Sequence, residues 1–429
     1  MVGTMAKIDD SVKKKVPELR FKGFTDEWEQ RKFDECFNFP VSTNSLSRAL
    51  LNYDEGDIKS VHYGDILIKY PAILNIKNDK IPYITGGKLE KYKSSLLENG
   101  DLIFADAAED ETVGKAVEVN GLTEENLVAG LHTIVARSKD KKAEFFLGYY
   151  INSNTYHRQL LRLIQGSKVS SISKGNLQKT LVSFPKDFEE QQKIGSFFKQ
   201  LDDTIVLHQR KLDLLKEQKK GYLQKMFPKN GEKVPELRFA GFADDWEERK
   251  LGDVLSERND QTPETNEYPL MSFVQGKGVT PKGERYNRSF LVKDSEKKYK
   301  KTELGDFIYS SNNLETGSIG FNRTGKAVIS PVYSIFKSKK SRESQFIGIM
   351  SARKDFISKM VRFRQGVVYG QWRIHESDFL NIDMKMPNDK EQQLIISFFE
   401  NIDKTIALHQ RKLDLLKEQK KGFLQKMFV

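Results

Sequence analysis

The chain has 429 residues, 38% of them hydrophobic and 31% charged, and its 71 Lys and Arg residues outnumber 60 Asp and Glu residues to give a net charge of +11. Its single cysteine, Cys36, excludes a disulfide framework and a cysteine-based zinc site. No run approaches the ~18–20 apolar residues that span a bilayer, and the first residues lack the apolar core of a signal peptide, so we expect a cytosolic protein. The positive excess favours a polyanionic partner, most often nucleic acid, although many ordinary cytosolic proteins are as basic.

Residues 1–15 are predicted to form an N-terminal tail that leads into a first domain over residues 16–185. This domain begins with VPELRFKGFTDEWEQRK at 16–32, and VPELRFAGFADDWEERK at 234–250 matches it at 13 of 17 positions. We call these two stretches the opening segments. Their Phe and Trp residues, placed beside acidic residues, predict packed segments whose aromatic side chains enter a core.

Each opening segment is followed by an insert, and the two inserts share little beyond general composition. Short apolar runs such as 101–104 and 306–309, punctuated by glycines, predict a β-rich α+β fold in each insert. A helical piece is expected at about 142–164 in the first and about 344–364 in the second. The second domain is expected over residues 229–387.

Loops in both inserts carry the side-chain types that read base edges: Arg and Lys toward guanine, Asn and Gln toward adenine, and Ser as a small donor and acceptor. For any single residue, a solvated polar loop group is the simpler interpretation. As a set in a basic, duplicated protein, they predict contact with DNA. The candidate DNA-binding residues are Gln165, Ser167, Lys168, Ser170, Ser171 and Lys174 in the first insert, and Arg285, Tyr286, Arg288, Asn312, Asn313, Gln365, Tyr369, Gln371 and Arg373 in the second.

A long amphipathic helix is expected after each insert, at 186–228 and 388–429. Both contain LHQRKLDLLKEQKKG, letter for letter, at 207–221 and 408–422. Apolar residues spaced by 4 and 3 in alternation form a heptad stripe, and a length near 38 residues corresponds to ~57 Å. Identical stripes favour an antiparallel coiled coil between the two helices; the alternative is that each helix covers only its own insert.

The start of each helix carries a capping pattern, Asp187 with Glu190 and Asn388 with Glu391. In such a pattern the first side chain accepts a backbone N–H, and the carboxylate three residues later reaches back to the backbone. Polar residues also interrupt the heptad stripe, where they set the register of a coiled coil more often than they bind a metal. These residues are His208, Lys219, His409 and Lys420.

The outer faces of the two helices are as identical as the stripe, although packing requires only the stripe. Recent duplication alone would explain the identity, but the inserts have diverged almost completely. The combination favours a docking surface presented twice to two copies of one partner. The candidate docking and spacer residues are Gln209, Arg210, Leu212, Leu215 and Lys216 in the first helix and Gln410, Arg411, Leu413, Leu416 and Lys417 in the second.

Motifs that would carry catalysis are missing from the sequence. Residues 320–327 resemble a phosphate-binding loop, but Ala327 stands where the magnesium-binding Ser or Thr belongs. Nucleophile-elbow, zinc-protease and adenine-methyltransferase motifs do not occur, and the six His residues are scattered. We therefore expect no catalysis by this chain and no metal site in it.

The opening segments, the Glu-Gln-Gln helix starts at 190–192 and 391–393, and the twin fifteen-residue stretches together resemble the specificity subunit of type I restriction–modification enzymes. The resemblance covers nearly the whole chain from about residue 16. It implies two target recognition domains in tandem, each reading one half of a bipartite double-stranded DNA target, separated by two long repeated helices that form an antiparallel coiled coil with pseudo-twofold symmetry.

The resemblance further implies that the helices set the spacing and dock two methyltransferase subunits, which restriction and translocase subunits join in the bacterial cytoplasm. S-adenosylmethionine, ATP and magnesium would then be bound by those partner subunits and not by this chain. Two alternatives remain: a stand-alone methyltransferase or nuclease with its own recognition domains, and a coiled-coil adaptor that binds no DNA.

Overall fold

The computed structural model describes residues 15–164, 169–229, 231–281 and 298–429. The chain divides into two compact units. Unit 1 contains the chain up to Gln209 together with Arg411–Val429, and unit 2 contains Arg210–Gln410. Each unit therefore combines one insert with the first part of one long helix and the last part of the other.

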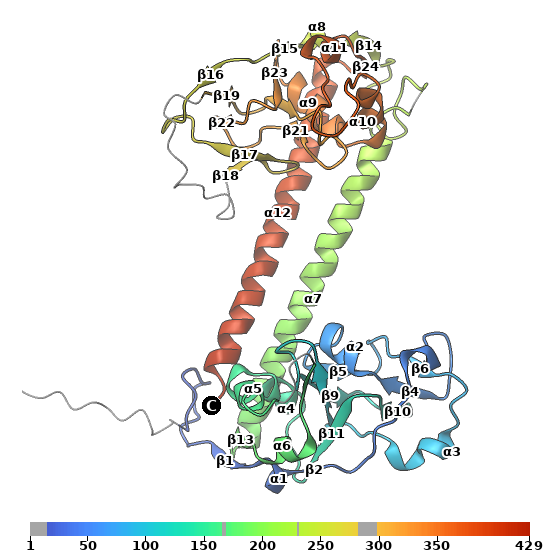
Figure 1. Cartoon of the computed structure of the whole chain (residues 1–429), viewed down its shortest axis with the longest axis vertical. Helices are drawn as coiled ribbons and strands as arrows, with labels where there is room; N and C mark the ends of the chain where they lie inside the picture. Colours follow the sequence, from blue (N-terminus) through green and yellow to red (C-terminus); the bar gives the residue numbers. More distant parts are fainter. Residues whose placement is uncertain (1–14, 165–168, 230, 282–297) are drawn as a thin grey trace, which may run out of the picture. The chain divides into compact units, whose positions relative to one another are not determined.

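Unit 1 is a mixed α/β body built around two sheets (Figure 1). Its strands are β1 (Glu29–Lys32), β2 (Phe37–Asn38), β3 (Leu51–Asn52), β4 (Ile58–Val61), β5 (Ile73–Asn75), β6 (Tyr83–Ile84), β7 (Leu102–Ala105), β8 (Ala107–Ala108), β9 (Ala116–Asn120), β10 (Asn126–Ala129), β11 (Thr133–Ser138), β12 (Ser170–Ser171) and β13 (Leu181–Phe184). Its short helices are α1 (Phe33–Cys36), α2 (Tyr63–Ile68), α3 (Leu89–Tyr92), α4 (Phe146–Ile151), α5 (Asn154–Leu161) and α6 (Lys174–Gln178), with 3-10 turns at Arg48–Leu50 and Lys93–Ser95.

The sheets of unit 1 have the orders β2-β11-β7-β9-β5 and β10-β4-β6-β3, and β1–β13 and β8–β12 form separate antiparallel pairs. Strand β7 is buried at every position, as the apolar run at 101–104 predicts. One core lies between this sheet and helices α4 and α5, and a second contains Val61, Ile66 and Val135.

Unit 2 repeats this plan, with fewer strands among the residues that the structure describes (Figure 1). Its strands are β14 (Glu247–Lys250), β15 (Leu255–Glu257), β16 (Gln261–Thr262), β17 (Met271–Val274), β18 (Gly278–Pro281), β19 (Tyr299–Thr302), β20 (Phe307–Tyr309), β21 (Ile319–Phe321), β22 (Ala327–Ile329), β23 (Ser334–Ser338) and β24 (Asp383–Met386). Its short helices are α8 (Leu251–Val254), α9 (Glu343–Met350), α10 (Lys354–Val361) and α11 (Glu376–Leu380). The sheets have the orders β15-β23-β20-β21 and β16-β19-β22, beside the pairs β14–β24 and β17–β18.

The two long helices are α7 (Phe188–Lys225) and α12 (Asp389–Lys426), each 38 residues long. In unit 1, Lys420 of α12 donates to Asp202 of α7 at 2.5 Å; in unit 2, Lys219 of α7 donates to Asp403 of α12 at 2.5 Å. The partner residue number falls as the number along α7 rises, so the helices pack antiparallel, as the heptad stripe predicts. The two Lys residues within the stripe thus form ion pairs between the two helices.

Each opening segment links the start of one long helix to the end of the other. In unit 1, the Leu19 N–H caps the Lys426 carbonyl at the end of α12 at 2.9 Å. The neighbouring Arg20 binds both oxygens of Glu190, near the start of α7, at 2.6 and 2.7 Å. Unit 2 repeats the arrangement: the Leu237 N–H caps Lys225 at 2.8 Å, and Arg238 binds Glu391 through two contacts of 2.8 Å.

The expected capping pattern is half right. The Asp187 side chain accepts the Glu189 N–H at 2.7 Å, and Asn388 accepts the Glu391 N–H at 3.0 Å. The carboxylates of Glu190 and Glu391 do not serve the backbone as predicted. Both are buried and directed to an arginine of the opening segment, because a buried carboxylate is stabilised far more by a bidentate guanidinium than by one N–H.

The end of each long helix closes the core of a unit. In unit 1, Phe428 is 4% exposed, and its ring centroid lies 5.5 Å from that of Phe198 and 6.3 Å from that of Trp28. In unit 2, Phe227 is 1% exposed and lies 5.9 Å from Trp246. The opening-segment tryptophans are therefore core residues, as predicted, and they pack on a residue from the end of a long helix.

We predict that Phe428→Ala and Phe227→Ala act on different units. Each substitution removes a buried ring and should cost about 3–5 kcal/mol in the unit whose core the ring fills. Hydrogen–deuterium exchange should show reduced protection of α4 in the first variant and of α9 in the second. Equal loss of protection in both helices for either variant would contradict separate closure of the two cores.

A buried carboxylate in unit 1 makes its stability depend on pH. Glu118 on β9 is 2% exposed, and its oxygens accept the N–H groups of Phe145 and Gly148 at 2.7 Å each. Burial raises the pKa of Glu118 from 4.5 to about 7, against the lowering effect of the two N–H groups. A carboxyl group whose pKa is raised in the folded protein stabilises the fold at pH values below its unfolded-state pKa. This stabilisation is lost as the pH rises through its folded-state pKa.

The predicted consequence is that unit 1 becomes less stable between about pH 5 and pH 8, by on the order of 3 kcal/mol. Glu118→Gln keeps a neutral group at this position and should remove most of that dependence. Urea unfolding at several pH values, followed by tryptophan fluorescence, measures the difference between the two proteins. Parallel stability curves for the wild type and the variant would rule out Glu118 as the titrating group.

Candidate nucleic-acid interface

In unit 2, the structure brings two of the predicted loops together. The Gly370 N–H donates to Asn312 Oδ1 at 3.0 Å, and the Tyr369 hydroxyl donates to Asn313 Oδ1 at 3.0 Å. The asparagines follow β20, and Tyr369 lies in the loop after α10, 56 residues further along the chain. Six of the nine candidates in this insert, Asn312, Asn313, Gln365, Tyr369, Gln371 and Arg373, therefore belong to two loops in contact. Arg285, Tyr286 and Arg288 lie outside the described residues.

The loop over residues 365–373, which we call the contact loop, is closed at its base. Gln365 and Arg373 exchange two backbone hydrogen bonds, at 2.7 and 2.9 Å. Next to the base, Trp372 packs against the guanidinium of Arg364 at 4.5 Å, and Arg364 makes two hydrogen bonds to Glu315 at 2.9 and 2.8 Å. A loop fixed in this way can present its tip to a ligand with little loss of conformational entropy.

Unit 1 has a corresponding site with different side chains. Ser170 pairs with Ala108 and Ser171 with Ala107, so alanines stand in β8 where unit 2 has the two asparagines. Lys174 follows on α6 and lies 5.5 Å from the ring of Phe39. Gln165, Ser167 and Lys168 lie outside the described residues.

A polar cluster beside β8 in unit 1 was not predicted. His132 is half exposed and lies 3.2 Å from Asp106, and its ring makes an edge contact with Tyr63 at 5.3 Å. His132 also has a positive φ of 54°, which is uncommon outside glycine. The Ile172 N–H donates to the Asp106 carbonyl at 2.8 Å, which places the cluster next to the predicted loop. No local pattern in the sequence marks these residues.

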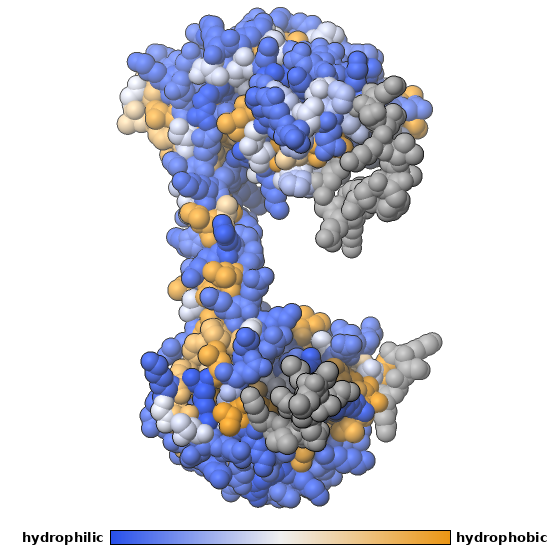
Figure 2. Space-filling view, turned by 90° about the vertical axis from the view of Figure 1, so that its left-hand side faces the viewer, coloured by the Kyte–Doolittle hydropathy of each residue, from blue (hydrophilic) through white to orange (hydrophobic). Residues whose placement is uncertain are grey.

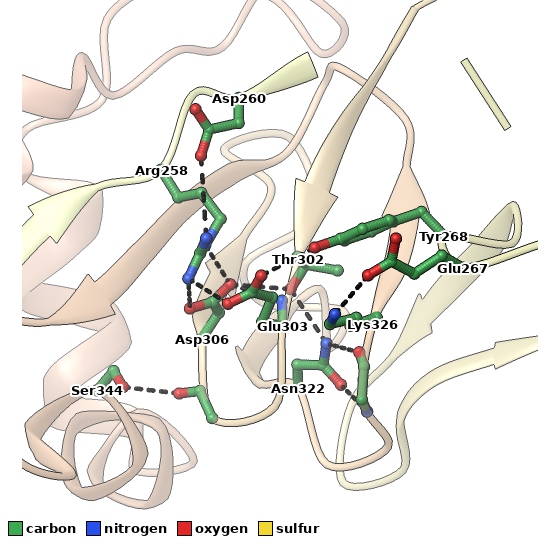
Figure 3. Close-up of polar contacts among 12 residues, drawn as sticks. Arg258, Asp260, Glu267, Tyr268, Thr302, Glu303, Asp306, Asn322, Lys326 and Ser344 are labelled. Carbon is green, nitrogen blue, oxygen red and sulfur yellow. Dashed lines mark hydrogen bonds and ion pairs between the residues drawn. The ribbon is translucent and has the colours of Figure 1, made fainter. Parts of the chain in front are cut away.

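Charged side chains around the turn between β19 and β20 of unit 2 form a structural network (Figure 3). Arg258 makes ion pairs with Asp306 at 2.7 Å and Glu303 at 3.0 Å, and the Tyr268 hydroxyl donates to Glu303 at 2.9 Å. Asp306 also accepts the Glu303 N–H at 2.7 Å. These carboxylates therefore fix the turn before β20.

The equivalent turn in unit 1 uses an arginine from a different strand. Asp101 accepts the Glu98 N–H at 2.8 Å and binds Arg137, on β11, at 2.7 and 2.8 Å. In unit 2 the arginine follows β15. The two inserts thus keep the turn and have changed the side chain that neutralises it.

The predicted docking and spacer residues separate into two groups. Leu212, Leu413 and Leu416 are buried, and Leu215 is half buried, so these leucines belong to the helix seam. The long charged residues Arg210, Lys216, Arg411 and Lys417 are exposed. Gln209 and Gln410 are half buried and engaged in contacts.

Exposed leucines on the long helices were missed by the sequence reasoning. Leu207 and Leu214 are 67% and 51% exposed, and their copies Leu408 and Leu415 are 60% and 46% exposed. Figure 2 shows apolar groups at the surface along the helical segment, among hydrophilic ones. The sequence did contain a signal for this surface. These leucines occur in both copies of the repeat although they lie off the heptad stripe, so packing of the two helices does not require them.

Among the described residues, no group of three or more His, Cys, Asp or Glu side chains is placed to hold a metal ion. Over the same part of the chain, no helix has the length and apolar character of a membrane span. The candidate functional surfaces in the described part of the chain are the polar loops of each unit and the repeated face of the long helices, which exposes leucines and basic residues.

Two unlike β-rich units joined to repeated helices define a tandem recognition protein. The sequence matches the family described as type I restriction modification DNA specificity domain over residues 25–217 and again over residues 243–418. The two matches cover most of the chain, which therefore belongs to this family: it is a DNA sequence-recognition subunit, and the family is non-catalytic. The predicted resemblance and fold class are confirmed.

Known proteins of this kind are similar over nearly their whole length. The chain is 22% identical over 415 residues to the putative type I restriction enzyme MjaX specificity subunit of Methanocaldococcus jannaschii. The matched region covers 93% of this chain and 92% of that protein. Its fold is similar to the crystal structure of the type I restriction–modification S subunit from M. genitalium, with a TM-score of 0.59, 12% identity and coverage of 96% and 99%. A chain from a study of complex assembly and conformational transition of the type I R-M system has a TM-score of 0.50 and 16% identity, with coverage of 92% and 96%.

We predict that Gly366→Ala disturbs the contact loop. Gly366 has φ +100°, and a Cβ there would lie 2.6 Å from the Gln371 carbonyl oxygen, a strain of about 1–3 kcal/mol. Exchange of amides 365–373 should increase, and the affinity of the assembled enzyme for DNA should fall. Gly221→Ala in α7, where a Cβ meets nothing within 4 Å, is the control and should be neutral or slightly stabilising. Unchanged protection of the loop in the first variant would contradict this prediction.

Proposed function

We propose that each unit reads one half of a bipartite, asymmetric DNA target, and that the long helices set the distance between the half-sites and dock two methyltransferase subunits. The observation that carries the proposal is the contrast between the identical fifteen-residue stretches of the two long helices and the dissimilar loops. A surface that appears twice suits two copies of one partner. Two unlike loop sets suit two different half-sites.

The DNA-binding part of the proposal rests on the contact loop in unit 2 and on Ser170, Ser171 and Lys174 in unit 1. Amide, hydroxyl and guanidinium groups of these loops match the donors and acceptors of base edges in the major groove. The net charge of +11 supports a polyanionic ligand. Lysines elsewhere on the units would contact phosphates, which position a protein without specifying a sequence.

The docking part rests on the repeated exposed leucines together with Arg210 and Arg411. Apolar side chains exposed together on a surface mark an interaction site, and arginine is enriched at protein interfaces. In the proposed complex, the methyltransferase subunits bind S-adenosylmethionine, and restriction and translocase subunits bring ATP and magnesium. The assembly acts on DNA in the bacterial cytoplasm.

Exchanging residues 38–183 for those of another specificity subunit tests the independence of the two units. The sequence of one half-site should change, while the other half-site and the spacing stay the same. The pattern of methylated adenines produced by the assembled enzyme measures both halves in one experiment. A change in both half-sites would contradict separate recognition.

Charge reversal at Arg210 and Arg411 tests the docking surface. The double variant Arg210→Glu, Arg411→Glu should bind the methyltransferase at least about tenfold more weakly, a loss of about 1.4 kcal/mol, because both exposed sites lose a positive group. Titration of the purified methyltransferase measures the loss. Lys22→Glu with Lys354→Glu is the control, since both residues are exposed and Lys22 lies where the second opening segment has Ala240. Equal weakening by both double variants would point to a general charge effect and not to docking.

A further inference from the structure

The tip of the contact loop exposes three apolar side chains in a row. Val367 is 91% exposed, Val368 is 52% exposed, and Tyr369 is 67% exposed. The base of the loop is fixed by the Gln365–Arg373 backbone pair and by packing of Trp372 on Arg364. Branched apolar groups held in water by a rigid loop suggest a surface that is covered by a ligand.

The asparagines beside this loop act on its position. Asn312 Oδ1 accepts the Gly370 N–H, and Asn313 Oδ1 accepts the Tyr369 hydroxyl, each at 3.0 Å. Both carbonyl oxygens are therefore engaged within the protein. The asparagines are positioning residues for the loop, and the side chains at the tip are left to make the contact.

The chemistry around the tip favours DNA over a protein partner. Between residues 365 and 375 the chain has no acidic residue, and its polar groups include Gln371 and Arg373. The Arg373 side chain is 63% exposed, and its guanidinium lies 3.6 Å from the Glu376 carboxylate. Glutamine and arginine are the types that make bidentate contacts with adenine and guanine in the major groove. The apolar feature that the major groove offers beside these groups is the 5-methyl group of thymine.

Resting on the proposed function, we propose that Val367 and Val368 contact thymine 5-methyl groups in the major groove of the half-site that unit 2 reads. That half-site then contains at least one A·T pair whose thymine methyl is recognised by apolar contact. Gln371 and Arg373 contact neighbouring base edges. The equivalent loop of unit 1 has Gly-Ser-Lys-Val-Ser-Ser between Gln165 and Ile172, where unit 2 has Gly-Val-Val-Tyr-Gly-Gln-Trp-Arg between Gln365 and Ile374, so the valine pair belongs to unit 2.

Replacement of thymine by deoxyuridine removes only the methyl group and tests the proposal. The assembled enzyme is titrated with duplexes that carry its mapped target, with deoxyuridine placed at one thymine at a time. Wild-type enzyme should lose roughly fourfold in affinity at one or two positions of one half-site, the value expected for one buried methyl group. Val367→Ala with Val368→Ala should weaken binding to the thymine duplex and bind both duplexes alike.

Val234→Ala is the matched control, because this valine is also exposed in unit 2 but lies in the opening segment. The control should keep the wild-type difference between thymine and deoxyuridine. Retention of that difference by the Val367, Val368 double variant would overturn the inference, as would weaker assembly with the methyltransferase in the absence of DNA. A sequence-specific enzyme that is indifferent to deoxyuridine at every thymine would overturn the inference alone. An assembled enzyme without any sequence preference would overturn the proposed function as well.

Discussion

The core of each unit is completed by the last residues of a long helix whose first residues belong to the other unit. Phe428 fills the core that contains Trp28, and Phe227 fills the core that contains Trp246. The same ends are capped by the opening segments, whose arginines bind buried glutamates at the helix starts. Removing one partner of such a buried pair costs about 3–5 kcal/mol, so helices and opening segments are constrained together.

This constraint explains what is repeated in the chain and what is not. An opening segment has to contact the start of one long helix and the end of the other, and the same contacts are made twice. Each insert needs only to end in a strand, β13 or β24, that pairs with β1 or β14 of the opening segment. They are free to change inside, as the arginines Arg137 and Arg258 show by neutralising equivalent turns from different strands. Recognition surfaces can therefore diverge without loss of the frame.

Local periodicity made the long helices and their antiparallel packing predictable, because a repeated heptad stripe is visible within single stretches of the sequence. Tertiary contacts were not predictable in the same way. Glu190 was assigned to a helix cap because its true partner, Arg20, lies 170 residues away. For the site, side-chain chemistry indicated the contact loop and the two asparagines separately, but not that Asn313 holds Tyr369. The His132 cluster gave no local signal, and the exposed Leu207 and Leu408 were overlooked although their duplication is visible.

The central claim is that this chain supplies sequence recognition, through two independent units, to a methyltransferase that it docks. The most direct measurement is to combine the purified chain with its methyltransferase and S-adenosylmethionine and to map the methylated adenines on DNA of random sequence. The account predicts one bipartite, asymmetric sequence with a fixed gap, and no methylation when either protein is left out. Methylation by the chain alone, or a single uninterrupted recognition sequence, would contradict it.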